Sequence, residues 1–167
     1  MGSNLGSDKM NDMLTARLTV EAFLADYMHA IDADRLEDWH SFFTEDGAYR
    51  VTTRENEELG LPLNIMSCKG HGMFKDRITA LRTANIFEPH VYCHIPGALR
   101  VISVNGDVID SESTFTIIRT TNHGDMRVFV CGRTRDRIRM TAGGPKLAAR
   151  TVILDSRQID TLLVIPI

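Results

Sequence analysis

The segment EPHVYCHIPG, which begins at Glu88, holds a carboxylate, two histidines, a tyrosine and a thiol within seven positions. Side chains of these types could bind a metal, transfer a proton or form the polar wall of a pocket. The residues VYCHI favour a strand, and Pro89 disfavours a helix. In a strand, alternate residues from Glu88 to His94 share one face, at intervals of about 6–7 Å. Every ligand must come within about 2.1 Å of a metal. An iron triad of Glu88, His90 and His94 therefore fits poorly, and the row predicts a pocket wall with no metal in this chain.

An acid–base site is the alternative interpretation of the same residues. Tyr27 lies on the apolar stripe of an expected helix, Asp32 follows the end of that helix, and His94 could approach from a sheet. A buried Asp–His pair could shuttle a proton in an isomerase or a dehydratase. In the simpler interpretation, the tyrosine finds a buried hydrogen-bond partner and does no chemistry. Both interpretations draw on one set of candidate pocket-lining residues: Tyr27, Asp32, Tyr49, His90, Tyr92 and His94.

A row of arginines is the second polar feature of the sequence. In CGRTRDRIRM the arginines occupy alternate positions, so in a strand they project from one face. Like charges at that spacing repel one another unless water or carboxylates compensate them. The row could be a solvated face paired with Asp110, Glu112 or Asp155, or an interface in which the guanidinium groups bind a partner's carboxylates. Both remain open for the four interface candidates: Arg133, Arg135, Arg137 and Arg139.

The size and composition of the chain limit the classes of protein to consider. The 167 residues, 43% hydrophobic and 25% charged, suit a single globular domain, expected at 11–167 after a flexible tail at 1–10. A net charge of −3 argues against a nucleic-acid partner, and no apolar run is long enough to span a membrane. Three cysteines without CxxC spacing predict reduced thiols and a cytoplasmic location.

Hydrophobic periodicity and turn signals predict the elements that position these residues. In the first half of the chain we expect a helix over about 11–31, a short helix capped by Asp34 with Glu37, a strand over 46–53, a loop over 55–64 and a helix over 73–84. After Pro89, turn signals at Asn105-Gly106, 121–125 and 141–146 separate long β-rich runs, which predicts an antiparallel meander.

Helices followed by a meander indicate the α+β class, with the helices packed on one face of a curved sheet. A long curved sheet wrapped round an N-terminal helix makes a cone with an internal pocket. This is the NTF2-like, or SnoaL-like, architecture.

Two strings carry a more specific resemblance, FLADYMHAIDADRLEDWHSFFTEDGAYRV and DRITALRTANIFEPHVYCHIPG. Their order and spacing, followed by the closing string TLLVIPI, resemble the small (β) subunit of aromatic-ring-hydroxylating dioxygenases. The resemblance spans roughly residues 20–167 and is greatest to the branch that serves terephthalate, anthranilate or salicylate-type hydroxylases.

The resemblance implies a subunit without catalytic residues of its own. It implies a homotrimer that binds three large (α) subunits in an α3β3 hexamer, which oxygenates an aromatic acid. The Rieske [2Fe-2S] cluster and the mononuclear iron would belong to the large subunit, with NAD(P)H acting through a reductase. A Rieske centre needs two cysteines and two histidines in paired loops, whereas here Cys93 and His94 are adjacent and no second pair follows. The alternative is a stand-alone isomerase or dehydratase that uses Tyr27, Asp32 and His94.

Overall fold

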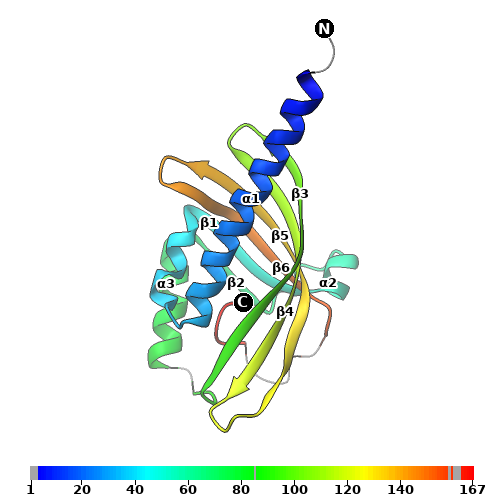
Figure 1. Cartoon of the computed structure of the whole chain (residues 1–167). Coiled ribbons are helices and arrows are strands. Elements are labelled where there is room, and N and C mark those ends of the chain that lie inside the picture. The colour runs from blue at the N-terminus through cyan, green and yellow to red at the C-terminus, as the bar shows by residue number, and fades with distance from the viewer. Residues whose placement is uncertain (1–3, 85, 158, 160–162) are drawn as a thin grey trace.

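The computed structural model describes residues 4–84, 86–157, 159 and 163–167. Helices precede the long strands, as the sequence predicts (Figure 1). The elements in chain order are α1 (Asn4–Asp32), the 3-10 helix η1 (Leu36–Phe42), β1 (Phe43–Thr53), α2 (Arg54–Glu58), β2 (Met66–Lys69), α3 (Gly70–Thr83), β3 (His90–Asn105), β4 (Val108–Thr121), β5 (Met126–Thr141) and β6 (Gly144–Leu154).

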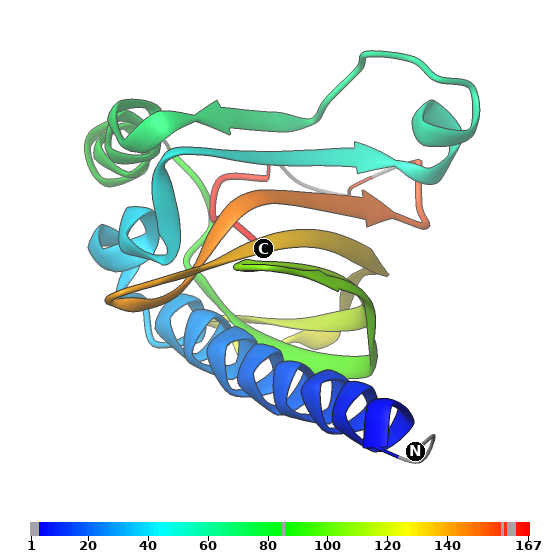
Figure 2. The ribbon, with the colours of Figure 1, turned by 90° about the horizontal axis from the view of Figure 1, so that it is seen from above.

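The six strands found among the described residues form one curved sheet in the order β2-β1-β6-β5-β4-β3. The antiparallel meander expected after Pro89 is confirmed for β3 to β6, with its turns at the predicted positions. One strand pairing differs from the antiparallel arrangement that the sequence predicts. Strand β1 runs parallel to β6, so the sheet is mixed. Figure 2 shows the sheet curling while α1 crosses its open side and α3 lies at the β2 end. The predicted α+β cone is confirmed.

The first turn after α1 departs from the expected helix cap. Asp34 adopts a positive φ of 57° and lies outside η1, whose N-cap is Arg35 with no side-chain hydrogen bond. Both carboxylate oxygens of Asp34 instead accept hydrogen bonds at 2.9 Å from Nη1 of Arg82, and Glu37 binds the same guanidinium at 2.8 Å. The capping prediction was wrong because a residue of α3, distant in sequence, competes for both carboxylates.

Other helix and strand boundaries also differ from those predicted. The first helix begins at Asn4, seven residues before the predicted start, and β1 begins at Phe43, three residues before the predicted start at 46. The expected loop contains α2, where the Thr53 hydroxyl accepts from the backbone N–H of Asn56. The short strand β2 was not predicted, and α3 begins at Gly70, whose φ of 74° suits glycine.

The core is centred on Trp39, at the point where α1, η1 and α3 pack against β1. Its ring meets those of Phe74 and Tyr49 edge-on at centroid distances of 4.6 and 5.0 Å. Its Nε1–H donates to the hydroxyl of Tyr27 at 3.0 Å. The ring of Phe43 lies tilted against that of Phe74, at a centroid distance of 4.4 Å, and completes the cluster. This aromatic cluster anchors the helices to one face of the sheet.

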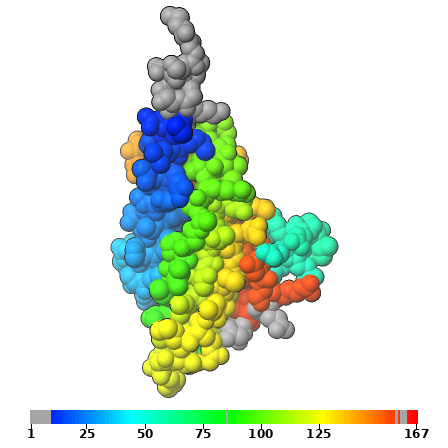
Figure 3. All heavy atoms as spheres, turned by 45° about the vertical axis from the view of Figure 1, so that its right-hand side comes forward, coloured from blue at the N-terminus to red at the C-terminus, as the bar shows by residue number. Residues whose placement is uncertain are grey.

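The outer face of the sheet is only partly covered. The helix α2 packs over β1 and β6, whereas β3 to β5, green to yellow in Figure 3, reach the surface between α1 and the projecting α2. Side chains at the β3/β5 end of this face remain exposed, at 61% for Val91, 45% for Ile95, 65% for Met126 and 63% for Val128. These four residues form what we call the apolar patch. No helix in the described part of the chain is both long and apolar enough to cross a membrane.

Candidate functional site

A cavity of about 200 Å³ lies between α1 and the inner face of the sheet. We call it the cone cavity. Its walls are largely apolar, with Glu21 of α1 among the polar residues of the lining. The sheet contributes His94 on β3, Ser113 on β4 and Thr134 on β5. Arg150 of β6 is also part of the lining. A mostly apolar hollow with a few polar groups is the usual character of a small-molecule site.

The only one of the six candidate pocket residues that lines the cone cavity is His94, and its ring is fixed by Asp32 at the end of α1. The Oδ1 atom of Asp32 lies 2.6 Å from Nδ1 of His94, and Oδ2 accepts the backbone N–H of the same residue at 2.9 Å. The histidine side chain is only 3% exposed. Its second ring nitrogen, Nε2, is buried without a hydrogen-bond partner among the described residues. The helix end therefore orients an imidazole whose outer nitrogen remains unsatisfied.

A buried polar network continues along the same face of the sheet. Oδ2 of Asp136 accepts from Arg150 at 3.0 Å and from the Thr134 hydroxyl at 3.1 Å, and Thr134 also bonds Ser113 at 2.8 Å. The guanidinium of Arg150 lies 4.6 Å from the ring centroid of Tyr27. Burial raises the pKa of Asp136, while the positive charge of Arg150 opposes that rise. The network holds a full ion pair inside the cone.

This buried network was not predicted from the sequence. The alternation of the arginine row could have indicated the network. If the arginines point outward, the residues between them, Thr134 and Asp136, must point inward. The same alternation on β6 turns Arg150 inward toward Asp136.

Tyr27 and Tyr49 are core residues and do not line the cone cavity. The Tyr27 hydroxyl accepts from Trp39, and burial raises its pKa to about 12. The Tyr49 hydroxyl donates to the backbone carbonyl of Ile167 at 2.9 Å and accepts its N–H at 3.0 Å. Burial raises the pKa of Tyr49 well above its ordinary value. Both hydroxyls are thus committed to structural hydrogen bonds.

A second hollow, of about 240 Å³, is lined in part by Asp32, His90 and Tyr92. Nδ1 of His90 lies 2.7 Å from the backbone carbonyl oxygen of Glu88. The structure therefore places His90 and His94 in different hollows, although they occupy one face of one strand. No group of three His, Cys, Asp or Glu side chains in the described part of the chain could hold a metal ion.

The arginine row lies on the outer face and meets carboxylates of the same chain. Arg137 contacts Asp110 at 3.1 Å, and longer contacts join Arg133 to Glu112 and Arg139 to Asp107. Asp155 pairs with Arg54 rather than with the row.

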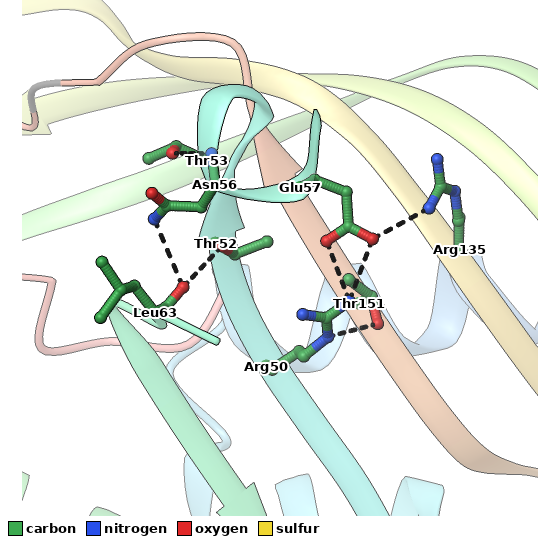
Figure 4. Close-up of polar contacts among 8 residues, drawn as sticks. All are labelled: Arg50, Thr52, Thr53, Asn56, Glu57, Leu63, Arg135 and Thr151. Carbon is green, nitrogen blue, oxygen red and sulfur yellow. Dashed lines mark hydrogen bonds and ion pairs between the residues drawn. The ribbon is translucent and has the colours of Figure 1, made fainter. Parts of the chain in front are cut away.

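The positive charge of the remaining arginine of the row, Arg135, is compensated by Glu57 of α2 (Figure 4). Its carboxylate binds Arg135 at 3.1 Å and Arg50 at 2.9 Å, and Arg50 also donates to the Thr151 hydroxyl at 3.2 Å. The contact attaches α2 to β1, β5 and β6. The row is therefore a compensated surface in the isolated chain.

Residues 12–151 match the family described as the SnoaL-like domain. The chain is 38% identical over 141 residues to the anthranilate 1,2-dioxygenase small subunit of Burkholderia cepacia, which covers 84% of this chain and 88% of that protein. It is 35% identical over 150 residues to the terephthalate 1,2-dioxygenase terminal oxygenase component subunit beta 1 of Comamonas sp., covering 90% and 97%.

The chain belongs to the SnoaL-like family and, within it, to the small subunits of aromatic-ring-hydroxylating dioxygenases. A solved structure described as the beta subunit of such a dioxygenase from Novosphingobium aromaticivorans superposes with a TM-score of 0.84 at 35% identity, covering 92% of this chain and 98% of that one. An NTF2-like protein with a cystatin-like fold from the same organism gives a TM-score of 0.63 at 17% identity, with coverage of 100% and 99%, and shares the fold alone. The predicted family resemblance is confirmed.

This small subunit does not fit the metal centres that its family name implies. Cys93 is exposed, on the outer side of β3, while the ring of the adjacent His94 is buried on the inner side and bound to Asp32. Successive residues of a strand point to opposite faces, so Cys93 and His94 cannot both bind one iron–sulfur cluster. The iron–sulfur chemistry is therefore not assigned to residues of this chain.

Proposed function

We propose that the chain is the non-catalytic small subunit of a dioxygenase whose large subunit contains a Rieske cluster and a mononuclear iron. One observation carries the proposal: the chain is 35–38% identical to small subunits along 84–90% of its own length. The partner would oxygenate an aromatic acid with electrons from NAD(P)H, delivered by a reductase. A cytoplasmic location belongs to the same proposal, and Cys68, Cys93 and Cys131 are free thiols that suit a reducing compartment.

The outer face of β3 to β5 is the proposed docking surface. The apolar patch lies at one end of that face, and the arginine row begins beyond it on β5. Exposed apolar area next to charged groups is typical of a protein–protein interface. We propose that this face serves the homotrimer and its contact with large subunits in an α3β3 assembly. Closed threefold symmetry would bury the patch without leaving an open end for polymerisation.

Light scattering and co-purification test the assembly. The isolated chain should have about three times its mass of 18.7 kDa, and it should capture a co-expressed Rieske-type large subunit. Elemental analysis should find iron in the complex but only traces in the isolated chain. A stable monomer that captures no large subunit would contradict the proposal.

A single substitution tests the surface. Val128→Asp places a charge within the apolar patch and should weaken the trimer or the capture of the large subunit. Leu18→Asp is the matched control, because Leu18 is similarly exposed, at 58%, but lies on α1. Equal effects of both variants would show that the patch has no special role.

The Asp32–His94 contact keeps one alternative testable, namely a stand-alone isomerase or dehydratase. The similarity to small subunits favours the dioxygenase subunit over this alternative. In addition, the hydroxyl of Tyr27, the third catalytic group of this alternative, already accepts a hydrogen bond from Trp39. The isolated chain should therefore neither isomerise nor dehydrate small cyclic ketones. Such an activity, lost in a folded His94→Ala variant, would establish the alternative.

A further inference from the structure

A residue in the wall of the cone cavity, His94, has an unsatisfied ring nitrogen that the proposed role as a small subunit does not use. Nε2 of His94 is buried without a hydrogen-bond partner among the described residues, although His94 is part of the cavity wall. Buried polar atoms in folded proteins are almost always hydrogen-bonded, so an orphan atom calls for an explanation. We propose that the cavity is a binding site for a neutral, single-ring phenol whose hydroxyl donates a hydrogen bond to His94.

The direction of that hydrogen bond follows from Asp32. An ionised carboxylate can only accept hydrogen bonds, so when the imidazole carries a single proton, that proton lies on Nδ1, 2.6 Å from Oδ1 of Asp32. The other nitrogen, Nε2, then carries a lone pair and accepts. The backbone N–H of His94 also donates to Asp32 and fixes the ring relative to the helix end. The ligand must therefore bring a donor, such as a hydroxyl, to satisfy this atom.

The size and lining of the cavity select a single ring. A dry cavity of about 150 Å³ with aliphatic and aromatic walls is large enough to bind benzene. The cone cavity, at about 200 Å³, adds room for a substituent. Leu24 and Met28 of α1 face Leu99, Phe115 and Val152 of the sheet across it. Such walls favour an apolar ring through the area that it removes from water.

The charges around the cavity disfavour a carboxylate. Arg150 is the cation in the lining, and Asp136 already binds it at 3.0 Å. Asp32 places a further negative charge behind His94. A second anion would enter without a free counter-ion, which is costly in a buried site. The cavity is therefore expected to reject the aromatic acids that the dioxygenase relatives are named for and to accept neutral hydroxylated rings.

Titration calorimetry on the isolated full chain tests the proposal with phenol, benzene and benzoate. Phenol should bind about tenfold more tightly than benzene, the usual effect of one hydrogen bond, and benzoate should bind more weakly than either. His94→Leu should bring the phenol-to-benzene ratio to about one while benzene still binds, because the apolar walls are unchanged. His90→Leu is the matched control: its side chain lines the second hollow, and the ratio should persist.

A second variant keeps the test decisive if His94→Leu fails to fold. Leu99→Trp fills the cavity and should abolish binding of both phenol and benzene while leaving His94 in place. The absence of saturable phenol binding, a preference for benzoate, or an unchanged ratio in folded His94→Leu would overturn the proposal. None of these results affects the proposed role as a small subunit, which capture of the large subunit tests separately.

Discussion

Replacing Arg150 by methionine isolates the contribution of the buried ion pair. In the wild type the side chains of Arg150 and Asp136 are only 6% and 1% exposed and lie 3.0 Å apart. Methionine fills much of the same volume but leaves the carboxylate without a counter-ion. Breaking a buried pair in this way costs about 3–5 kcal/mol, a large part of a typical folding free energy of about 5–15 kcal/mol.

The cost should depend on pH because Asp136 can take up a proton. Burial already raises its pKa above 3.8, and Arg150 acts against that rise, so removing Arg150 raises the pKa further. When the pKa of a carboxyl is raised in the folded state, its protonation stabilises the fold. This stabilisation is fully present below the ordinary pKa of 3.8 and is lost as the pH rises through the folded-state pKa. The deficit of Arg150→Met should therefore be small near pH 4 and grow toward neutral pH.

Urea unfolding followed by Trp39 fluorescence, at one protein concentration and several pH values, measures this deficit. Arg133→Met is the control, since Arg133 is 39% exposed and 3.8 Å from Glu112; its cost should stay below about 1 kcal/mol. Adding Asp136→Asn to Arg150→Met removes the unpaired charge and should recover part of the loss at neutral pH. A deficit below about 1 kcal/mol, or one independent of pH, would refute the reasoning.

Three further substitutions test other contacts. Tyr27→Phe leaves the buried Nε1–H of Trp39 without an acceptor and should cost about 1–3 kcal/mol in urea unfolding; a neutral effect would mean that water replaces the hydroxyl. Tyr49→Phe removes both hydrogen bonds to the backbone of Ile167, and faster amide hydrogen exchange at that residue should report it; unchanged exchange would contradict the anchoring role. Glu57→Gln weakens the attachment of α2 at the surface and should lower the free energy of unfolding by less than about 1 kcal/mol; a larger loss would show that α2 stabilises the sheet.

The sequence predicted the features that depend on local periodicity. The alternation in β5, the turns of the meander and the apolar stripe of α1 each repeat within a few residues, so the class of fold and the outward direction of Arg135 and Arg137 followed directly. The strand that presents His94 to the interior also followed from alternation.

Features set by distant partners could not be predicted in this way. Asp34 has the sequence context of a helix cap, but Arg82 lies against it in space and takes its carboxylate. The register between β5 and β6 determines that Asp136 meets Arg150, and no local pattern specifies that register. The pairing of β1 with β6 likewise depends on the whole sheet.

The parallel pair of β1 and β6 has a consequence for the synthesis of the protein. Until residue 154 has left the ribosome, one edge of β1 has no neighbour, and the Tyr49–Ile167 hydrogen bonds, which span 118 residues, cannot form. Contacts so remote in sequence slow folding, and an unpaired edge is a template for pairing with another chain. We therefore expect the domain to fold only after residue 167 has left the ribosome. The nascent chain, with helices formed and β1 still open, would be the species most in need of a chaperone.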